Sequence, residues 1–242
     1  MAGYDIHFHF DPVCPFAWLT SRWVQQVSRL RSYSVDWRFI SLRIINKDVD
    51  YESHFPVGYT EGHQAGLRLL RVCAAARRDH GHQVVGPLYT TIGESVFVHS
   101  DDPPAKALEL AAGDGLDEVL AGAGLPASLS RALDDDAWDA EVASESEAVL
   151  ELTGRDVGTP IIQFEPPDGV AFFGPVISRL PSDADAIQLW DHVIGLASFP
   201  GFAEMKRSLR EAPQFGPPDA APGPVVSEDW QAGSRREARP AS

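Results

Sequence analysis

The order of the predicted strands and helices is the feature that most constrains the fold of this chain. Near the N-terminus, two strand patterns, Tyr4–Phe10 and Val35–Phe39, flank a helical pattern over Cys14–Leu30. A strand, a helix and a second strand form a βαβ unit, in which the strands are parallel and the crossover is right-handed. Far along the chain, turn residues between Ile161–Phe164 and Val170–Phe173 indicate a hairpin. Neither group can bury its apolar faces alone, so we expect one α/β core completed by both ends of the chain.

Between these groups, from about Glu61 to Gly154, apolar positions recur with helical spacing. We expect helices over Glu61–His80, Pro87–Val98, Pro104–Ala112, Leu116–Ala121, Pro126–Leu133 and Asp136–Leu152. The sequence therefore predicts an all-helical insertion in the α/β core. Two more helical patterns follow the hairpin, at Asp183–Ser198 and Phe202–Arg210. After Ala212 the apolar periodicity ends, which predicts a flexible tail in which Val225, Val226 or Trp230 could still dock.

The charge and the cysteine content limit the partners and the compartment. A net charge of −15 and a pI near 4.8 disfavour nucleic acid and anionic lipid, and we expect neither as a partner. The N-terminal residues lack the pattern of a signal peptide, and no apolar stretch approaches the roughly 20 residues that cross a bilayer. The chain has two cysteines, Cys14 and Cys73. We therefore expect a cytoplasmic protein in which both are thiols.

Cys14 lies where the first strand has ended and the first helix begins, within Asp-Pro-Val-Cys-Pro at residues 11–15. A thiol at a helix N-terminus lies among unpaired N–H groups at the positive end of the helix dipole, which favours the reactive thiolate. Pro15 suits a first helical turn, where no backbone donor is needed. Phe16 and Trp18 could form an apolar wall for a flat substrate, although core packing is the more frequent role. Phe16, inside the motif, should be exposed to the site. Cys14 could also be a small apolar residue at a junction, but its context favours a nucleophile.

The segment Cys14–Ala17 occupies the place of the Cys-x-x-Cys motif in DsbA-like thiol oxidoreductases. Over about residues 4–210 the chain resembles the actinobacterial mycothiol-dependent nitroreductases of that superfamily. The matching segments are Asp11–Pro15, Trp18, Thr20–Trp23, Ser41-Leu42, Asn46, Tyr59, Gly86–Tyr89, Val157–Pro160 and Phe172–Val176. The resemblance implies an α/β, thioredoxin-like fold with an inserted all-helical domain. We accordingly expect a thioredoxin-like domain at 1–60 and 155–210, a helical lid domain at 61–154 and a flexible tail at 211–242.

The resemblance also implies roles for four further residues. Thr159 and Pro160 would be joined by a cis peptide that faces the active cysteine; cis X–Pro is a minority state that typically occupies tight turns. Asn46 and Tyr59 fall where the nitroreductases keep an Asn and a Tyr beside the substrate. There they could orient a polar substrate or stabilise a developing enolate. The alternatives are loop solvation for Asn46 and packing for Tyr59.

The chain departs from the dithiol motif at its second cysteine, which is replaced by Ala17. A dithiol enzyme closes its cycle when the second thiol attacks the mixed disulfide, and Ala17 cannot do so. Cys73 lies among apolar residues of a predicted helix, so we expect it to be buried packing. The sequence keeps the nucleophile and lacks the resolving thiol.

Two chemistries remain, and we favour the first. The Cys14 thiolate could add reversibly to a conjugated small molecule, so that the former double bond rotates and elimination regenerates the thiolate, a cis–trans isomerisation without net redox and without a cofactor. Alternatively, an external low-molecular-weight thiol such as mycothiol could resolve a Cys14 adduct, giving a monothiol oxidoreductase or nitroreductase. A noncatalytic binding module is the third reading. The partner expected is a small-molecule substrate, free or on an acyl carrier protein, and a homodimer is left open.

Other chemistries lack their residue patterns. Neither the pair His7 and His9 nor the pair His80 and His82 has a carboxylate or thiol at ligand spacing, so we expect no metal. No glycine-rich dinucleotide or phosphate loop and no Gly-x-Ser-x-Gly elbow is present, so the sequence does not indicate NAD, flavin or ATP.

Overall fold

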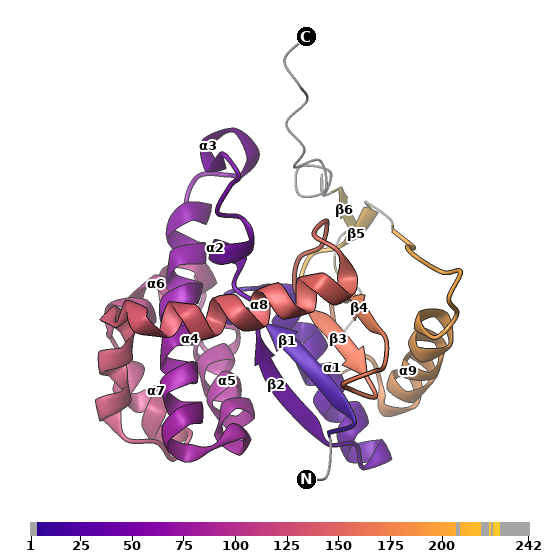
Figure 1. Ribbon diagram of the computed structural model, residues 1–242, viewed down its shortest axis with the longest axis horizontal. Coiled ribbons are helices and arrows are strands. Elements are labelled where there is room, and N and C mark those ends of the chain that lie inside the picture. Colours follow the sequence, from indigo (N-terminus) through magenta and orange to yellow (C-terminus); the bar gives the residue numbers. More distant parts are fainter. Residues whose placement is uncertain (1–3, 207–208, 219–222, 224, 228–242) are drawn as a thin grey trace.

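The computed structural model describes residues 4–206, 209–218, 223 and 225–227. At its centre is a four-stranded mixed sheet in the order β2-β1-β3-β4 (Figure 1). The strands are β1 (Ile6–Phe10), β2 (Val35–Phe39), β3 (Ile161–Phe164) and β4 (Ala171–Phe173). β1 and β2 are parallel, whereas β3 runs antiparallel to both β1 and β4. The predicted βαβ unit and the predicted hairpin are therefore confirmed, and the two halves of the chain share one sheet.

The helices α1 (Pro15–Arg31) and α9 (Asp183–Ala197) pack side by side on one face of the sheet. Their contact is centred on Trp23, whose indole N–H donates to the Ala186 carbonyl at 3.1 Å. The rings of Trp23 and Trp190 meet edge to face, with centroids 5.1 Å apart. Both indoles are fully buried, so the helix expected after the hairpin completes the core formed by the first unit.

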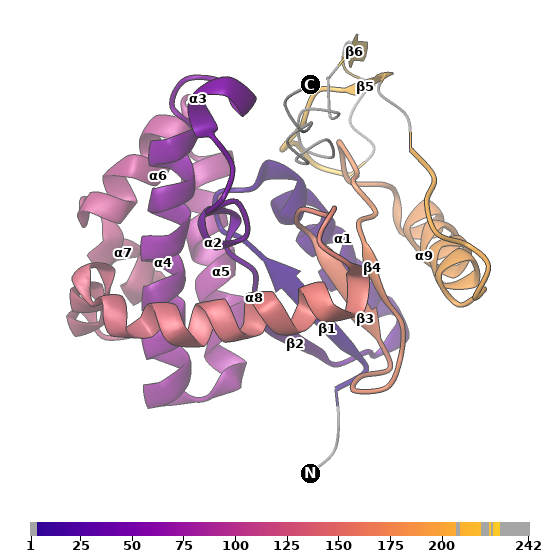
Figure 2. The same ribbon diagram turned by 45° about the horizontal axis from the view of Figure 1, so that its top comes forward.

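The remaining helices lie together beside the sheet, and α8 runs across its other face (Figures 1 and 2). These are α2 (Leu42–Ile45), α3 (Tyr51–His54), α4 (Tyr59–His80), α5 (Val85–Gly93), α6 (Pro103–Ala112), α7 (Leu116–Gly122) and α8 (Asp139–Thr153). Shorter turns, η1 (His82–Val84), η2 (Glu94–Val98), η3 (Ala127–Asp134) and η4 (Asp136–Trp138), connect them. Within the described residues, no helix has the length and apolar character that a membrane crossing requires.

Three of the expected helices differ in type from the prediction. The pattern Pro87–Val98 divides into α5 and the π-helical turn η2. The pattern Pro126–Leu133 is the 3-10 helix η3, and the first turn of the pattern Asp136–Leu152 is the 3-10 turn η4. Apolar spacing over one or two turns does not distinguish these helix types, because their periods of three to five residues overlap at that length.

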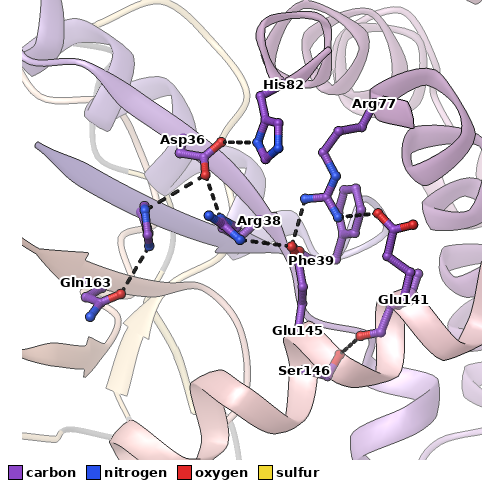
Figure 3. A network of polar contacts seen from close by, with 11 residues as sticks. Asp36, Arg38, Phe39, Arg77, His82, Glu141, Glu145, Ser146 and Gln163 are labelled. Carbon is purple, nitrogen blue, oxygen red and sulfur yellow. Dashed lines mark hydrogen bonds and ion pairs between the residues drawn. The ribbon is translucent and has the colours of Figure 1, made fainter. Parts of the chain in front are cut away.

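A polar network joins β2 to the helical block (Figure 3). Arg38 on β2 donates to Glu145 of α8 at 3.1 Å, and Arg77 of α4 donates to the same carboxylate at 2.8 Å. The second oxygen of Glu145 accepts from the Phe39 backbone N–H at 2.8 Å. Asp36, almost fully buried, accepts from Arg38 at 2.6 Å. One carboxylate thus fixes a strand and two helices relative to one another.

The segment after α9 corrects two expectations. No helix is present over Phe202–Lys206, where the Phe202 ring stacks on Phe172 at 5.6 Å, and Leu209–Glu211 is a strand, β5. β5 pairs antiparallel with β6 (Val225–Ser227). The start of the predicted flexible tail is also held against the body of the protein, since the Gln214 N–H donates to the Ser178 carbonyl at 2.8 Å. The residues beyond 227, including Trp230, lie outside the described part of the chain.

Candidate active site

Cys14 is the N-cap residue of α1. Its backbone is extended, with φ −83° and ψ 115°, and its Sγ accepts the Ala17 N–H at 3.4 Å. Pro15 occupies the first helical position, as expected. The sulfur therefore takes the place of a capping oxygen, next to backbone donors and at the positive end of the helix dipole. A backbone donor and a helix N-terminus are two features that favour a thiolate over a thiol.

Thr159 lies against Cys14, although 145 residues separate them in the sequence. In the thiol form Sγ donates to the Thr159 carbonyl at 3.5 Å. The Thr159–Pro160 peptide is cis, as the resemblance implied, and the Thr159 hydroxyl donates to the His9 carbonyl at 3.4 Å. Thr159 and Pro160 are both buried, at the point where their loop enters β3. The sheet thus brings the cysteine loop of one half of the chain against the proline loop of the other.

Neither Ala17 nor Cys73 provides a second reactive thiol. Ala17 is fully buried in the first turn of α1. Cys73 is fully buried on α4, and this burial raises the pKa of its thiol to about 12. The expectation that Cys73 is core packing is confirmed.

Asp11 positions the loop that precedes Cys14, a role that the sequence did not reveal. Its carboxylate is fully buried and accepts the backbone N–H groups of Val13 at 3.1 Å and Leu42 at 2.8 Å. Burial raises the pKa of Asp11 to about 7, although these two hydrogen bonds lower it. Gly66 of α4 packs onto this loop so closely that a Cβ there would lie 2.4 Å from Asp11 Oδ1.

Asn46 and Tyr59 are placed in different settings. Asn46 is fully buried at the end of α2, and its Nδ2 donates to the Leu42 carbonyl at 2.7 Å. Its Oδ1 is buried without a hydrogen-bond partner among the described residues. Tyr59 is the first residue of α4 and is 45% exposed, with its ring stacked on Phe55 at 5.5 Å. Neither finding assigns a substrate role, so both residues remain predicted substrate-binding positions.

Phe16 and Trp18 are both buried in the core, at 6% and 2% exposure, so the expectation of an exposed Phe16 is corrected. The Trp18 ring packs against Phe97 and Tyr89, with centroid distances of 5.9 Å in each case. The Arg22 guanidinium lies 4.0 Å from the centre of the Trp18 ring. Trp18 therefore packs in the core, and the substrate-binding role expected of Phe16 and Trp18 stays a prediction.

A cavity of about 270 Å³ lies further along α1 and is lined by Trp18, Arg22 and Glu94, among others. Cys14 is 8% exposed and is not among the lining residues. The described residues contain no group of three or more His, Cys, Asp or Glu side chains that could hold a metal ion. At the start of α1, one sulfur lies against the cis-proline loop.

A parallel β1–β2 pair extended by an antiparallel hairpin, with a cysteine at the start of α1 facing a cis-proline, defines a DsbA-like member of the thioredoxin fold. Residues 13–207 match the family of the mycothiol-dependent nitroreductase Rv2466c, and the chain belongs to this family. The uncharacterized protein Rv2286c of Mycobacterium tuberculosis (strain ATCC 25618 / H37Rv) is 30% identical over 208 residues, which cover 84% of this chain and 81% of that protein.

Two solved structures are more distant in sequence. A putative protein-disulfide isomerase from Pseudomonas syringae is 16% identical, with a TM-score of 0.47, and the match covers 78% of this chain and 92% of that one. A 2-hydroxychromene-2-carboxylate isomerase is 14% identical, with a TM-score of 0.49, over 78% of this chain and 94% of the other.

Proposed function

We propose that this protein is a single-cysteine oxidoreductase that uses a low-molecular-weight thiol of the mycothiol type to reduce small disulfide substrates. The observation that carries the proposal is the position of the Cys14 sulfur: it caps α1, accepts the Ala17 N–H and lies 3.5 Å from the Thr159 carbonyl beside the cis-proline. Family membership supports the choice of thiol, since the matching family is named for mycothiol dependence.

The reaction needs three thiol–disulfide exchanges. In the first, a mycothiol thiolate attacks the substrate disulfide in solution, which gives a mixed disulfide and one substrate thiolate that takes up a proton. The Cys14 thiolate attacks the mycothiol sulfur of a mixed disulfide, so that a Cys14–mycothiol disulfide forms and the substrate leaves as a thiolate that takes up a proton. A second mycothiol thiolate then attacks the mycothiol sulfur of this intermediate and releases Cys14. Two electrons pass from two mycothiol molecules to the substrate, and mycothiol disulfide is the oxidised product. Ala17 suits this cycle because it has no thiol to attack the Cys14–mycothiol disulfide, so the external thiol resolves that intermediate.

The neighbours of Cys14 have defined tasks in this proposal. The Ala17 N–H and the helix dipole stabilise Cys14 as an attacking and as a leaving thiolate. The Thr159–Pro160 loop borders the sulfur, where it would align the substrate disulfide with Sγ. Asn46 and Tyr59 are proposed to contact the rest of the substrate. Asn46 offers a buried carbonyl oxygen, and Tyr59 offers an exposed phenol at the start of α4.

The absence of a second thiol at Ala17 also favours the isomerisation that we preferred from the sequence alone. In that reaction the Cys14 thiolate adds to one end of a conjugated double bond, the carbon–carbon bond rotates, and elimination returns both the double bond and the thiolate. No electron donor is consumed. We now rank this second, because the family match adds support for a thiol-dependent reductase.

One experiment separates these functions. The protein is supplied with bis(2-hydroxyethyl) disulfide and mycothiol, and mycothiol disulfide is measured while intact mass records any adduct on the protein. Our proposal requires turnover that depends on mycothiol, together with a mycothiol adduct that is absent from Cys14→Ser. Isomerisation of a conjugated enone or acid without thiol consumption would support the second candidate instead. A protein whose Cys14 forms no adduct with either class of substrate would indicate a binding module.

A further inference from the structure

Asp11 and Cys14 are the two ends of one tight turn. The Cys14 N–H donates to the Asp11 carbonyl at 3.1 Å, which closes a four-residue turn whose end Cα atoms lie within about 7 Å of each other. Asp11 is fully buried, and Cys14 is 8% exposed. Two ionisable side chains therefore lie close together where solvent and salt screen their charges poorly.

The carboxylate of Asp11 has hydrogen bonds but no ion pair. Its partners are the backbone N–H groups of Val13 and Leu42. Among the described residues, no Lys, Arg or His side chain lies within ion-pair distance of it. Arg22 of α1 and Arg77 of α4 act on neighbouring groups, but neither is among the groups that shift the pKa of Asp11. A negative charge on Asp11 is therefore not neutralised locally.

The other ionisable groups around Asp11 stay neutral. They are Cys73 on α4 and Tyr89 on α5, and burial raises the pKa of Cys73 to about 12 and that of Tyr89 well above its usual range. Tyr89 also senses both ends of the turn, because negative charge on Asp11 and on Cys14 each raises its pKa. The two side chains thus act on one region of the interior, and Cys14 is the group there that can compete with Asp11 for ionisation.

Two negative charges in these positions repel each other. For charges about 7 Å apart at an effective dielectric constant of about 20, the repulsion corresponds to roughly a fiftyfold change in an ionisation constant. We propose that Asp11 and Cys14 share one negative charge, so that Asp11 holds a proton while Cys14 is a thiolate. Asp11 acts on the reaction through Cys14 and does not touch the substrate. Because burial raises the pKa of Asp11 to about 7, the exchange of this proton falls in the neutral range.

This inference rests on the proposed function only in taking Cys14 as the nucleophile. When the external thiol resolves the Cys14 disulfide, Cys14 leaves as a thiolate and the Asp11 carboxylate takes up one proton from solvent. When Cys14 attacks and becomes a disulfide again, Asp11 can return that proton to solvent. The two ionisation steps of the turn then belong to the pair rather than to either residue.

Alkylation of Cys14 by iodoacetamide tests the inference without mycothiol. Intact mass follows the label as a function of pH, and Cys14→Ser measures any labelling of Cys73. Wild type is compared with Asp11→Asn, or with the smaller neutral Asp11→Ser if circular dichroism shows that the Asn variant does not fold. Asp48→Asn, exposed in the loop after α2, is the matched control for charge. If Cys14 ionises after Asp11, the neutral variant should be alkylated about tenfold faster at low pH, and Asp48→Asn should match wild type.

If Cys14 ionises before Asp11, the shift appears on the carboxyl group instead. Carbon-13 NMR of labelled aspartate follows the Asp11 carboxyl, whose signal is identified by its loss in the neutral variant. The midpoint of its titration should then be lower in Cys14→Ser than in wild type. Because the interaction is reciprocal, the two midpoint shifts together should amount to about one pH unit or more.

Unchanged midpoints for both Cys14 and Asp11 would overturn the inference and leave the proposed function standing. A lower alkylation rate at every pH, with no shift in either midpoint, would also overturn it, because Asp11 would then only hold the loop in place. Midpoint shifts in a protein that forms no mycothiol adduct would support the shared charge and reject the proposed function.

Discussion

The carboxylate of Asp11 accepts the backbone N–H of Leu42 at 2.8 Å, and this bond ties the loop before Cys14 to the first turn of α2. The Leu42 carbonyl in turn accepts the Asn46 side chain at 2.7 Å. A buried acid thus connects the cysteine loop to the segment that carries a predicted substrate-binding residue. Because burial raises the pKa of Asp11 to about 7, this connection is sensitive to pH.

Asp11 should make the stability of the protein fall as the pH rises from about 4 to 7. Its pKa is near 3.9 in an unfolded chain and about 7 in the folded one, so the folded state binds the proton more tightly in this window. The free energy of unfolding should then decrease by up to about 1.4 kcal/mol per pH unit. Urea unfolding of wild type and Asp11→Asn at a series of pH values measures this change in the free energy of unfolding. The advantage of wild type over the variant should shrink as the pH rises, and a constant or growing advantage would contradict the assignment.

Cys14→Ser should reduce turnover by about 10³-fold or more, because a hydroxyl at neutral pH is a far weaker nucleophile than a thiolate. Serine can still cap α1 and donate to the Thr159 carbonyl, so the melting temperature should stay within a few degrees of wild type. The measurements are thiol-dependent turnover and thermal unfolding. Retained activity in a folded Cys14→Ser protein would rule out covalent catalysis at this position.

Ala17→Cys should restore the ability to form a disulfide within the first turn of α1. We expect the oxidised variant to lose two hydrogens in intact mass, and its adducts with mycothiol to decay without added thiol. Ala17→Ser is the control, with a similar volume and no sulfur. Since Ala17 is fully buried, both variants should lose about 1–3 kcal/mol of stability. Adducts that persist equally in both variants would show that position 17 cannot reach the adduct.

Gly66→Ala should disturb the cysteine loop through packing alone. A Cβ at residue 66 would lie 2.4 Å from Asp11 Oδ1 and 2.9 Å from Val13 Cγ2, so the loop must shift. We expect a loss of about 1–3 kcal/mol and a fall in turnover. Gly62→Ala, on the same helix with no atom within 4 Å, should be neutral or stabilise by up to about 1 kcal/mol. Equal effects of the two substitutions on turnover would refute this role for the close packing.

The sequence predicted those parts of the structure that depend on local pattern or on a shared motif. Alternation at Val35–Phe39 and the Cys-Pro junction at Cys14 are local, and Thr159–Pro160 was identified by resemblance. The Arg22 cavity could not be predicted, because its walls come from segments far apart, and no spacing in the sequence relates Arg22 to Glu94 or Phe215.

The C-terminal segment was mispredicted for a related reason. Phe215 packs on Phe97 at 5.1 Å, but it is a single apolar residue among Pro and Gly and shows no periodicity. The expected helix over Phe202–Arg210 failed because the Phe202 ring packs on Phe172 of β4, a tertiary contact that overrides a weak helical pattern. Both errors arise where a lone side chain, rather than a repeating face, anchors the chain.

The separation of 145 residues between Cys14 and Thr159 has a consequence for biosynthesis. At the usual ~5–20 residues per second, the ribosome adds Thr159 roughly 7 to 29 s after Cys14. During that interval the nascent chain carries its sulfur without the loop that will border it. In the proposed function, thiol exchange by partly made chains would therefore take place without the Thr159–Pro160 loop that borders the sulfur.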